Sequence, residues 1–286
     1  MENTGERLLT DDVYETTIEH LHRYAFALQF VSYKKVVDIA SGEGYGSNLL
    51  AELAESVTGI DIAKESVEHA SIKYKKDNLK YIIGSADNIP VEDNTVDVVV
   101  SFETIEHHDK HHEMLKEIKR ILKDDGILII SSPDKYYYSD LRKTQNPYHI
   151  KELYFQEFKD LISLYFPNQS YYSQKLDYTS LILEENECSD FYEFSGNFEK
   201  ITRNSQISNS VFHLAVASQF PVEKHFNSIF SAAKVLENNI DQFKKREKEF
   251  HDYYKSIIEE YQKSRNYKLG KTILAPIRLI KEILKK

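Results

Sequence analysis

One short stretch decides the fold: Val37–Gly46, which reads VDIASGEGYG. Its first residues belong to a β-branched run, and its three glycines, Gly42, Gly44 and Gly46, lead into a segment with helical periodicity. Glycines at such a junction allow a tight turn and let the backbone approach a ligand without a Cβ in the way. The stretch therefore predicts a strand whose carboxyl end binds a ligand, as in a doubly wound α/β sheet.

Around this turn, from about Lys35 to Ser132, short β-branched runs alternate with longer helical stretches. The alternation is typical of parallel strands joined by crossover helices. We expect strands at Lys35–Ala40, Val57–Asp61, Leu79–Gly84, Val96–Phe102 and Ile127–Ser131, and helices at Gly46–Glu55, Ala63–Lys75 and Lys110–Lys123. A further helix is expected around Asn146–Phe166, and Ser170–Leu176 with Val211–Ser218 is expected as an edge hairpin that closes the sheet. The predicted fold class is α/β, with a doubly wound, mostly parallel seven-stranded sheet.

The hydrophobic period changes in the C-terminal part of the chain. From Ile229 to Tyr261, seam residues recur at alternating steps of four and three, with Glu247 as the one charged member. Such a heptad seam predicts a C-terminal coiled-coil extension that joins copies of the chain into a homo-oligomer, although such a helix can also fold back on its own domain. The expected organisation is an N-terminal helical segment at 1–34, the α/β domain at 35–220, the coiled-coil helix at 228–262 and a basic amphipathic tail at 263–286.

That tail holds eight Lys or Arg and a single acid, Glu282. Four apolar residues from Ile273 to Leu284 recur at helical spacing, with basic residues beside them. The pattern predicts a helix that lies on an anionic membrane surface. The alternative is a charged terminus that docks on the acidic domain or is disordered.

Composition restricts the function further. Of the 286 residues, 41% are hydrophobic, which is enough to bury a sizeable core, and the formal charge of −9 argues against a nucleic-acid partner. The single cysteine, Cys188, excludes an internal disulfide framework. The first residues lack a charged leader and an apolar signal segment, and no run of eighteen apolar residues occurs. We therefore expect a cytoplasmic protein, peripheral on the inner face of the membrane if the tail binds lipid.

Asp61 is a second sign of ligand binding. It ends the second predicted strand, 19 residues after Gly42, where an acid accepts both ribose hydroxyls of a bound nucleoside. With these residues the region Lys35–Leu183 resembles the class I S-adenosylmethionine-dependent methyltransferases. Their first motif matches the glycine stretch, their second-strand acid matches Asp61 within TGIDI, and their adenine-binding stretch matches Gly84–Pro90, which reads GSADNIP.

The resemblance implies S-adenosylmethionine as cofactor. Asp61 would hold the ribose, Asp87 would accept from the adenine amino group, Ala86 would supply a backbone contact, and Asp38 with the glycine loop would surround the methionine part. The implied cofactor-binding set is Asp38, Ala40, Gly42, Gly44, Gly46, Asp61, Ile62, Ala86, Asp87 and Glu103. A dinucleotide dehydrogenase competes, but its G-x-G-x-x-G fingerprint would place the third glycine one residue after Gly46. The remaining alternative is that the glycines only make a turn.

The residues after the fourth predicted strand, 101–108, read SFETIEHH. Glu103, Glu106 and His107, with the later His149, resemble the divalent-metal site of the small-RNA 2′-O-methyltransferases and the ubiquinone-pathway O-methyltransferases. Two carboxylates and two imidazoles suit Mg²⁺, Mn²⁺, Fe²⁺ or Zn²⁺, and we expect Mg²⁺ or Mn²⁺. A metal would lower the pKa of an acceptor hydroxyl. A metal-free enzyme would use His149 or His107 as general base, and in a purely structural interpretation Glu106 and His107 cap the next helix while His149 satisfies a loop.

A narrower resemblance joins Ser101–His107 with Asn146–Leu153, which reads NPYHIKEL. These segments look like bacterial methyltransferases of surface-polysaccharide and O-antigen pathways, which implies a sugar, a nucleotide sugar or a lipid-linked glycan as acceptor. A small phenolic or quinone precursor is the alternative acceptor, and a catalytically silent cofactor-binding scaffold is the alternative to an enzyme. Similar enzymes place an N-terminal helix as a lid, so Arg23 would meet the methionine carboxylate and Tyr24 or His20 the acceptor, unless this helix only packs.

Overall fold

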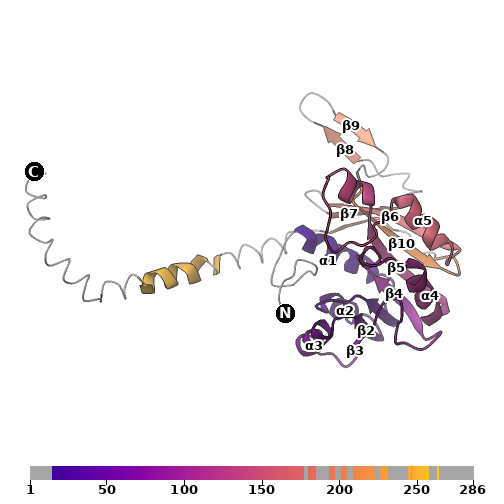
Figure 1. Ribbon diagram of the computed structural model, residues 1–286, viewed down its shortest axis with the longest axis horizontal. Helices are drawn as coiled ribbons and strands as arrows, with labels where there is room; N and C mark the ends of the chain where they lie inside the picture. The colour runs from indigo at the N-terminus through magenta and orange to yellow at the C-terminus, as the bar shows by residue number, and fades with distance from the viewer. Residues whose placement is uncertain are drawn as a thin grey trace, which may run out of the picture. The chain divides into compact units, whose positions relative to one another are not determined.

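The computed structural model of the chain describes residues 15–176, 180–184, 193–196, 201–204, 209–222, 226–230, 244–245, 247–257 and 263. The chain divides into two compact units, Met1–Ala232 and Ala233–Lys286. The first unit contains a nine-stranded sheet with the order β11-β7-β6-β10-β5-β4-β1-β2-β3, together with a two-stranded sheet of β8 and β9 (Figure 1).

Five neighbouring strands of the large sheet are parallel, as the alternating pattern predicted. They are β1 (Lys35–Ile39), β2 (Ser56–Asp61), β3 (Leu79–Ile83), β4 (Val96–Ser101) and β5 (Leu122–Pro133). The others in this sheet are β6 (Asn168–Leu176), β7 (Ser180–Glu184), β10 (Phe212–Ser218) and β11 (Ser228–Phe230), and the small sheet pairs β8 (Glu193–Gly196) with β9 (Ile201–Asn204). Seven strands, β3-β2-β1-β4-β5-β10-β6, form the mostly parallel sheet that was expected.

The two strands predicted as an edge hairpin do pair with each other, but they do not lie at the edge of the sheet. β10 lies between β5 and β6 and pairs antiparallel with both, and β7 and β11 extend the sheet beyond β6. The reason is visible in the burial of β10, since all seven of its residues are buried. A strand with both faces and both edges covered belongs inside a sheet.

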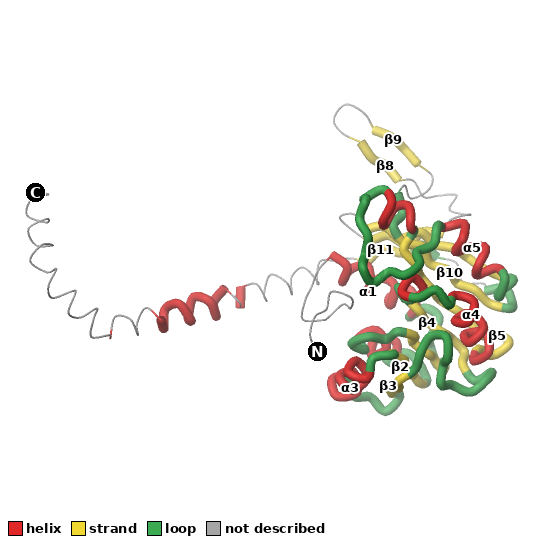
Figure 2. Tube along the Cα trace, in the orientation of Figure 1, coloured by secondary structure: helices red, strands yellow, loops and turns green. Residues whose placement is uncertain are grey.

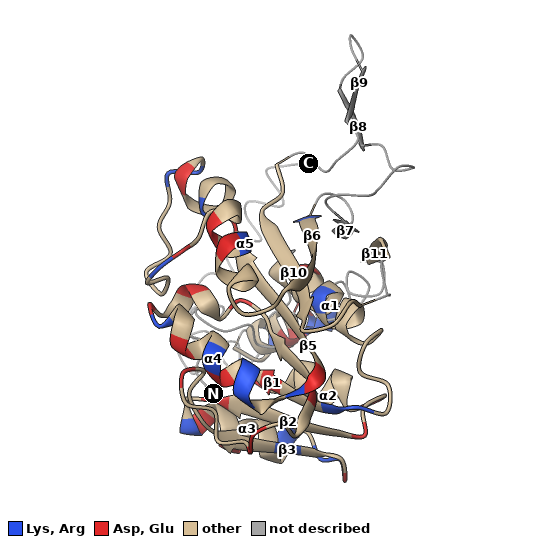
Figure 3. Ribbon diagram, turned by 90° about the vertical axis from the view of Figure 1, so that its right-hand side faces the viewer, with Lys and Arg blue, Asp and Glu red and all other residues tan. Residues whose placement is uncertain are grey.

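Helices cover both faces of the sheet (Figure 2). One core cluster joins the sheet to the apolar faces of α4 and α5, through residues such as Met114, Ile118 and Phe158. The other joins it to α1 and α2, through residues such as Phe26 and Leu50. The helical segments are α1 (Glu15–Ala27), α2 (Tyr45–Leu50), α3 (Lys64–Lys73), η1 (Ile105–His107), α4 (His111–Ile121), the π-helix η2 (Tyr136–Asp140) and α5 (Phe155–Ser163). Figure 3 shows the charged residues mainly on helices and loops, as this layering requires.

The helix expected around Asn146–Phe166 is shorter than predicted. It begins at Phe155, where the Glu157 carboxylate accepts the Tyr154 backbone N–H at 3.0 Å and Asp134 accepts the Phe155 N–H at 2.9 Å. These bonds satisfy amides that a helix start leaves unpaired. The preceding residues stay in a loop that takes His149 to the site.

The expected start of the C-terminal helix is also wrong. Ile229, the first seam residue, lies in β11 and pairs with Leu181 of β7, which leaves its side chain 68% exposed. Further along, residues 247–257 are helical, and Phe250, Tyr254 and Ile257 of the seam are exposed. The other seam residues from Ala233 to Phe243, Tyr261 and the tail after Lys263 lie outside the described residues. Within the described ranges, no helix is long and apolar enough to cross a bilayer.

Candidate active site

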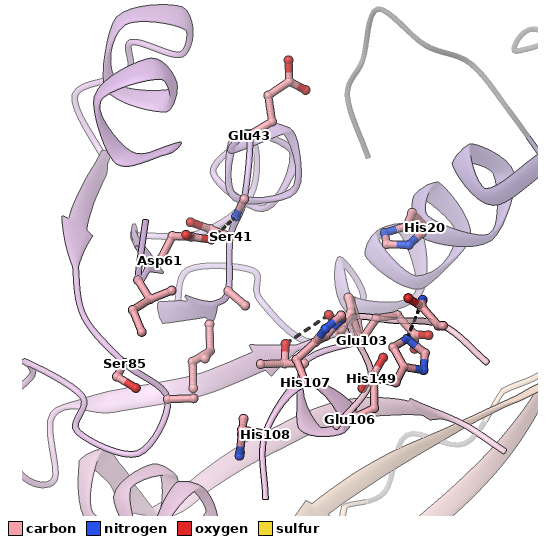
Figure 4. A pocket seen from close by; sticks show the side chains of 18 of the residues that line it. His20, Ser41, Glu43, Asp61, Ser85, Glu103, Glu106, His107, His108 and His149 are labelled. Atoms are coloured by element: carbon pink, nitrogen blue, oxygen red, sulfur yellow. Dashed lines mark hydrogen bonds between the residues drawn. The ribbon is translucent and has the colours of Figure 1, made fainter. Parts of the chain in front are cut away.

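A cavity of about 780 Å³ opens at the carboxyl ends of the parallel strands. Its walls come from the loops that follow β1, β2, β3 and β4, from one side of α1 and from the loop around His149. This is the edge at which doubly wound sheets bind ligands, and the volume lies within the range of small-molecule sites. Figure 4 shows Asp61 on one side of this space and Glu106, His107 and His149 gathered on another.

Of the three motif glycines, Gly42 lines the cavity, and Gly44 and Gly46 do not. A Cβ on Gly44, whose φ is +94°, would lie 2.8 Å from the Tyr81 hydroxyl, and a Cβ on Gly46 would lie 1.9 Å from the Tyr24 ring. The last two glycines therefore allow close packing against β3 and α1. Their predicted place beside the cofactor is corrected, because only the first glycine faces the space.

Asp38 is also displaced from its predicted role around the methionine part. Its carboxylate is fully buried beneath the loop, away from the cavity lining, where it accepts hydrogen bonds from Ser47 Oγ at 2.6 Å and Tyr24 Oη at 3.3 Å. Burial raises the pKa of Asp38 to about 7. The side chain therefore ties β1 to α2 and α1. Ala40, which follows β1 with a φ of 56°, does line the cavity.

Asp61 is held in a fixed orientation at the end of β2. Its Oδ2 accepts the Gly42 amide at 2.9 Å and its Oδ1 accepts the Ala63 amide at 2.8 Å. Its neighbour Ile62 is exposed and lines the same cavity. The glycine loop and the acid predicted to hold the ribose are thus directly bonded to each other.

Asp87 and Ala86 lie in the cavity wall after β3, as the predicted adenine end requires. A hydrogen bond from Lys110 Nζ, at 2.5 Å from Oδ2, and a second one from Ser85 lower the pKa of Asp87 to about 2. The carboxylate is therefore an ionised acceptor at neutral pH, which suits an amino group as its ligand.

Glu103 departs from the predicted metal set. It follows β4 with a φ of 50°, in the left-handed region that residues other than glycine rarely adopt. Its Oε1 accepts Ser131 Oγ at 2.6 Å and lies 3.7 Å from Nη1 of Arg23. These two partners hold Glu103 beside the cavity, outside the group of candidate ligands.

Three of the four predicted ligands do come together. One ligand atom from each of Glu106, His107 and His149 lies within 4.8 Å of the others. His107 Nδ1 lies 3.0 Å from the Tyr148 carbonyl oxygen, and His149 Nδ1 lies 2.5 Å from Glu152 Oε1. Acceptors on the second ring nitrogen are the usual outer-shell partners of metal-binding histidines.

Glu106 supplies the test of whether a cation fits. The side chain is 1% exposed, and neither carboxylate oxygen has a hydrogen-bond partner among the described residues. Burial, followed by the charge of Glu103, raises the pKa of Glu106 well above its ordinary range. A buried carboxylate without donors beside two imidazoles fits a divalent cation. It does not fit the helix-cap interpretation, since a cap carboxylate would accept backbone N–H groups.

Comparison with known proteins points in one direction. Residues 37–130 match a family model described as methyltransferase domain. The chain is 33% identical over 130 residues to a probable S-adenosylmethionine-dependent methyltransferase of Mycolicibacterium smegmatis, over 45% of this chain and 50% of the relative. It is 33% identical over 103 residues to a ubiquinone biosynthesis O-methyltransferase of Pelagibacter ubique, over 35% and 42% of the two chains. The chain thus spans about half the length of the curated relatives that it matches.

The fold comparison agrees. The crystal structure of the YcgJ protein from Bacillus subtilis aligns with a TM-score of 0.50 at 16% identity, over 70% of this chain and all of that one. Residues 37–130 therefore form a methyltransferase domain. The fold that the glycine stretch predicted is therefore confirmed, and the relative from Mycolicibacterium smegmatis is named for the donor that the resemblance implied.

The helix α1, which precedes the matched residues, forms part of the cavity wall through His20 and Tyr24. Arg23 does not line the cavity, and its contact with the methionine carboxylate stays a prediction. Its side chain is fully buried, bonded through Nε to Gln174 at 2.8 Å, with the guanidinium 4.3 Å from the centre of the Phe212 ring. His20 contacts the Tyr45 hydroxyl at 2.9 Å, and burial lowers the pKa of His20 to about 3.

Several site residues carried no recognisable signal in the sequence. Lys110 precedes α4 and neutralises Asp87, and Glu152 bonds to His149 from three residues away. Tyr138, from η2, and Phe212, from the strand that was expected at the edge of the sheet, also line the cavity. The Glu152 spacing relative to His149 was readable, but only as one of many acid and histidine pairs.

Proposed function

We propose that this methyltransferase transfers the methyl group of S-adenosylmethionine to a sugar hydroxyl in cell-surface glycan assembly, assisted by a divalent cation such as Mg²⁺ or Mn²⁺. The observation that carries the proposal is the group of Glu106, His107 and His149, whose ligand atoms lie within 4.8 Å of one another in the cavity that also contains Asp61 and Asp87. The proposed donor site and the proposed acceptor site therefore belong to one cavity.

The donor would lie along the strand ends. Asp61, oriented by the Gly42 and Ala63 amides, can accept both ribose hydroxyls, and ionised Asp87 can accept from the adenine amino group. The methionine part and its reactive carbon then extend toward Glu103 and Glu106. The positive sulfonium is favoured there, because the lining carries several acids and, among the described lining residues, one lysine, Lys110, which is paired with Asp87.

Methyl transfer needs a deprotonated acceptor. One lone pair of the acceptor oxygen forms the new oxygen–carbon bond, the carbon–sulfur bond breaks with its pair remaining on sulfur, and the hydroxyl proton leaves to a base. A divalent cation at the three ligands would lower the pKa of the hydroxyl. With the cation bound, His149 would serve as its ligand and the acidified proton would leave to water, whereas without a cation His149 would itself take the proton. Alignment of the reacting atoms supplies much of the remaining acceleration.

The acceptor end of the cavity favours a molecule with adjacent hydroxyls. Asn146, His149 and Glu106 offer polar contacts, while Tyr138 and Phe212 offer apolar faces on which a sugar ring can lie. Two neighbouring hydroxyls can also bind one cation together. A sugar fits this description, and the two segments Ser101–His107 and Asn146–Leu153, which resemble surface-polysaccharide methyltransferases, support it.

A small phenolic or quinone precursor is the second candidate. It is favoured by the similarity to a ubiquinone biosynthesis O-methyltransferase over 103 residues. Its two neighbouring ring hydroxyls would use the same ligands. The two candidates differ in the ring that must lie against Tyr138 and Phe212, so only a direct assay of acceptors separates them.

The test is a methylation assay with the purified full chain and S-adenosylmethionine. Simple glycosides, nucleotide sugars and lipid-linked glycans are compared with catechols, and products are identified by mass spectrometry. We expect O-methylated sugar, loss of turnover in chelator and recovery with Mg²⁺ or Mn²⁺. A protein that binds the donor in calorimetry but methylates no hydroxyl would instead be the cofactor-binding scaffold.

The role of the cation is tested with Glu106→Gln, using Glu113→Gln on the exposed side of α4 as its matched control. Calorimetry with Mn²⁺ should show binding to the wild type and the control and at least tenfold weaker binding to Glu106→Gln. Full turnover of the wild type in chelator would refute metal assistance, and leave His149 as the general base.

A further inference from the structure

Glu152 is a buried acid that no part of the proposed reaction uses. Its Oε1 lies 2.5 Å from His149 Nδ1, and the two side chains are only 8% and 7% exposed. Ser139, from the π-helix η2, donates its hydroxyl to the same oxygen at 2.8 Å. Glu152 does not line the cavity, so it reaches the chemistry only through the imidazole.

The contact has a consequence for the two nitrogens of that imidazole. A carboxylate accepts hydrogen bonds and does not donate them, so the ring proton of neutral His149 belongs on Nδ1. Nε2 then keeps its lone pair, which accepts a hydrogen bond from the Asn146 side-chain nitrogen at 3.0 Å and would exchange this donor for a metal or a proton. The tautomer that results is the one that a metal ligand or a general base on the cavity side requires.

The plane of the ring is held as well. Tyr138 stacks on His149 with ring centres 5.1 Å apart and an interplanar angle of 26°, and His107 meets its edge at 5.1 Å. Stacking on Tyr138 fixes the plane of the His149 ring but lets the ring turn within that plane. The hydrogen bond from Nδ1 to Glu152 prevents this turn. The direction of Nε2 therefore depends on the Tyr138 contact and the Glu152 bond together.

We propose that Glu152 is a positioning residue, supported by Ser139, that sets the tautomer and direction of His149 Nε2 in the active site. The inference deepens the proposed function, on which its catalytic meaning rests. A purely structural role would be to join the η2 segment to the loop before α5. That role predicts lost stability on substitution, with no change in which nitrogen of His149 carries the proton.

The experiment compares the wild type with Glu152→Gln and Glu152→Asp in the full chain with ¹⁵N-labelled histidine. Two-bond ¹H–¹⁵N NMR spectra, with His149 assigned by His149→Gln, report the protonated nitrogen without metal or acceptor. We expect the Nδ1–H form in the wild type. The Gln variant should give a tautomer mixture, since its amide can donate as well as accept. The Asp variant retains the negative charge, but its side chain is too short to reach His149 Nδ1. It should therefore also give a mixture of tautomers.

Two further readouts connect this to function. Mn²⁺ binding by calorimetry should weaken 10- to 100-fold in Glu152→Gln, the range found for outer-shell partners, while S-adenosylmethionine binding stays within twofold. The kcat for the acceptor found in the assay should fall at least tenfold, with a smaller change in KM. Asp160→Asn, at an exposed position in α5, is the control for the loss of a nearby negative charge.

An unchanged Nδ1–H signal and unchanged Mn²⁺ affinity in both variants would overturn the proposal. Should Glu152→Gln fail to fold, Glu152→Asp and Ser139→Ala decide the question by the same spectrum. A wild type that binds no Mn²⁺ and methylates no acceptor would refute the proposed function alone, because the tautomer measurement depends on neither.

Discussion

Substitution of Gly46 by Ala tests whether the third motif glycine serves packing. The added Cβ would lie 1.9 Å from Cζ of Tyr24, where ordinary contacts begin at 3.4 Å, so the ring would have to retreat by about 1.5 Å. That ring is buried, packs edge-on against Phe102 with 5.2 Å between ring centres, and donates to Asp38. Moving the ring toward the cavity would break these contacts with Phe102 and Asp38.

Whether Gly46→Ala raises or lowers the free energy of unfolding shows which matters more at this position, helix propensity or packing against Tyr24. Gly46 lies in α2, where helix propensity alone would make alanine more stable by about 1 kcal/mol. Overpacking of a buried ring costs about 1–3 kcal/mol. With a cost near the upper end, we expect a net loss of about 2 kcal/mol in the free energy of unfolding, or about 4–8 °C in Tm for a domain of this size.

The assay is urea denaturation of the wild type, Gly46→Ala, Tyr24→Ala and the double variant. Because a smaller side chain at 24 leaves room for the new methyl, the two substitutions should be coupled by at least about 1 kcal/mol. Gly42→Ala is the control, since nothing lies within 4 Å of its added Cβ and only its φ of +53° opposes the change. A Gly46→Ala protein as stable as the wild type, or additive effects in the cycle, would refute the packing role.

Three further experiments test the donor site, the buried Asp38 and the C-terminal helix. Asp61→Asn should weaken S-adenosylmethionine binding at least tenfold in calorimetry, because one acceptor for the ribose hydroxyls is replaced by an amide; an unchanged Kd would remove Asp61 from the donor site. Asp38, with its pKa of about 7, binds its proton more tightly in the folded state, so its contribution to stability is full below about pH 4 and disappears as pH rises through 7. Urea denaturation at pH 5 and pH 8 should show this slope in the wild type and a smaller one in Asp38→Asn. Charged residues in place of Phe250 and Tyr254, exposed on the helix at 247–257, should dissociate an oligomer in light scattering, and a monomeric wild type would reject the predicted homo-oligomer.

The local signals in the sequence were sufficient for much of the fold. The runs that became β1 to β5 are short, β-branched and separated by helical periods, so tertiary context had little to override. β10 was placed at an edge because its sequence shows that it is apolar, but not which strands pair with it. That information resides in contacts with β5 and β6, from residues about 85 and 45 positions earlier in the chain.

The sequence likewise predicted the position of some site residues and not of others. Asp61, Asp87 and the ligand group could be placed from spacing, because strand ends and turns bring such residues to one edge. Gly44, Gly46 and Asp38 match the family pattern equally well, yet they face α1, α3 and β3 instead of the cavity. A sequence motif does not show which of its residues contact the ligand. Some of them only support the loop that makes the contact.

Glu103 and Glu106 show how the fold gives neighbouring acids different tasks. The charge of Glu103 disfavours the ionised form of buried Glu106, and an unpaired buried carboxylate is costly. The left-handed backbone at Glu103 turns its side chain to Ser131 and toward Arg23, which comes from α1, 80 residues earlier. Glu106 receives no such donor and is left to the imidazoles. The left-handed backbone therefore directs Glu103 away from Glu106. The protein itself stabilises the Glu103 carboxylate, while the oxygens of Glu106 have no donor among the described residues and would bind a cation.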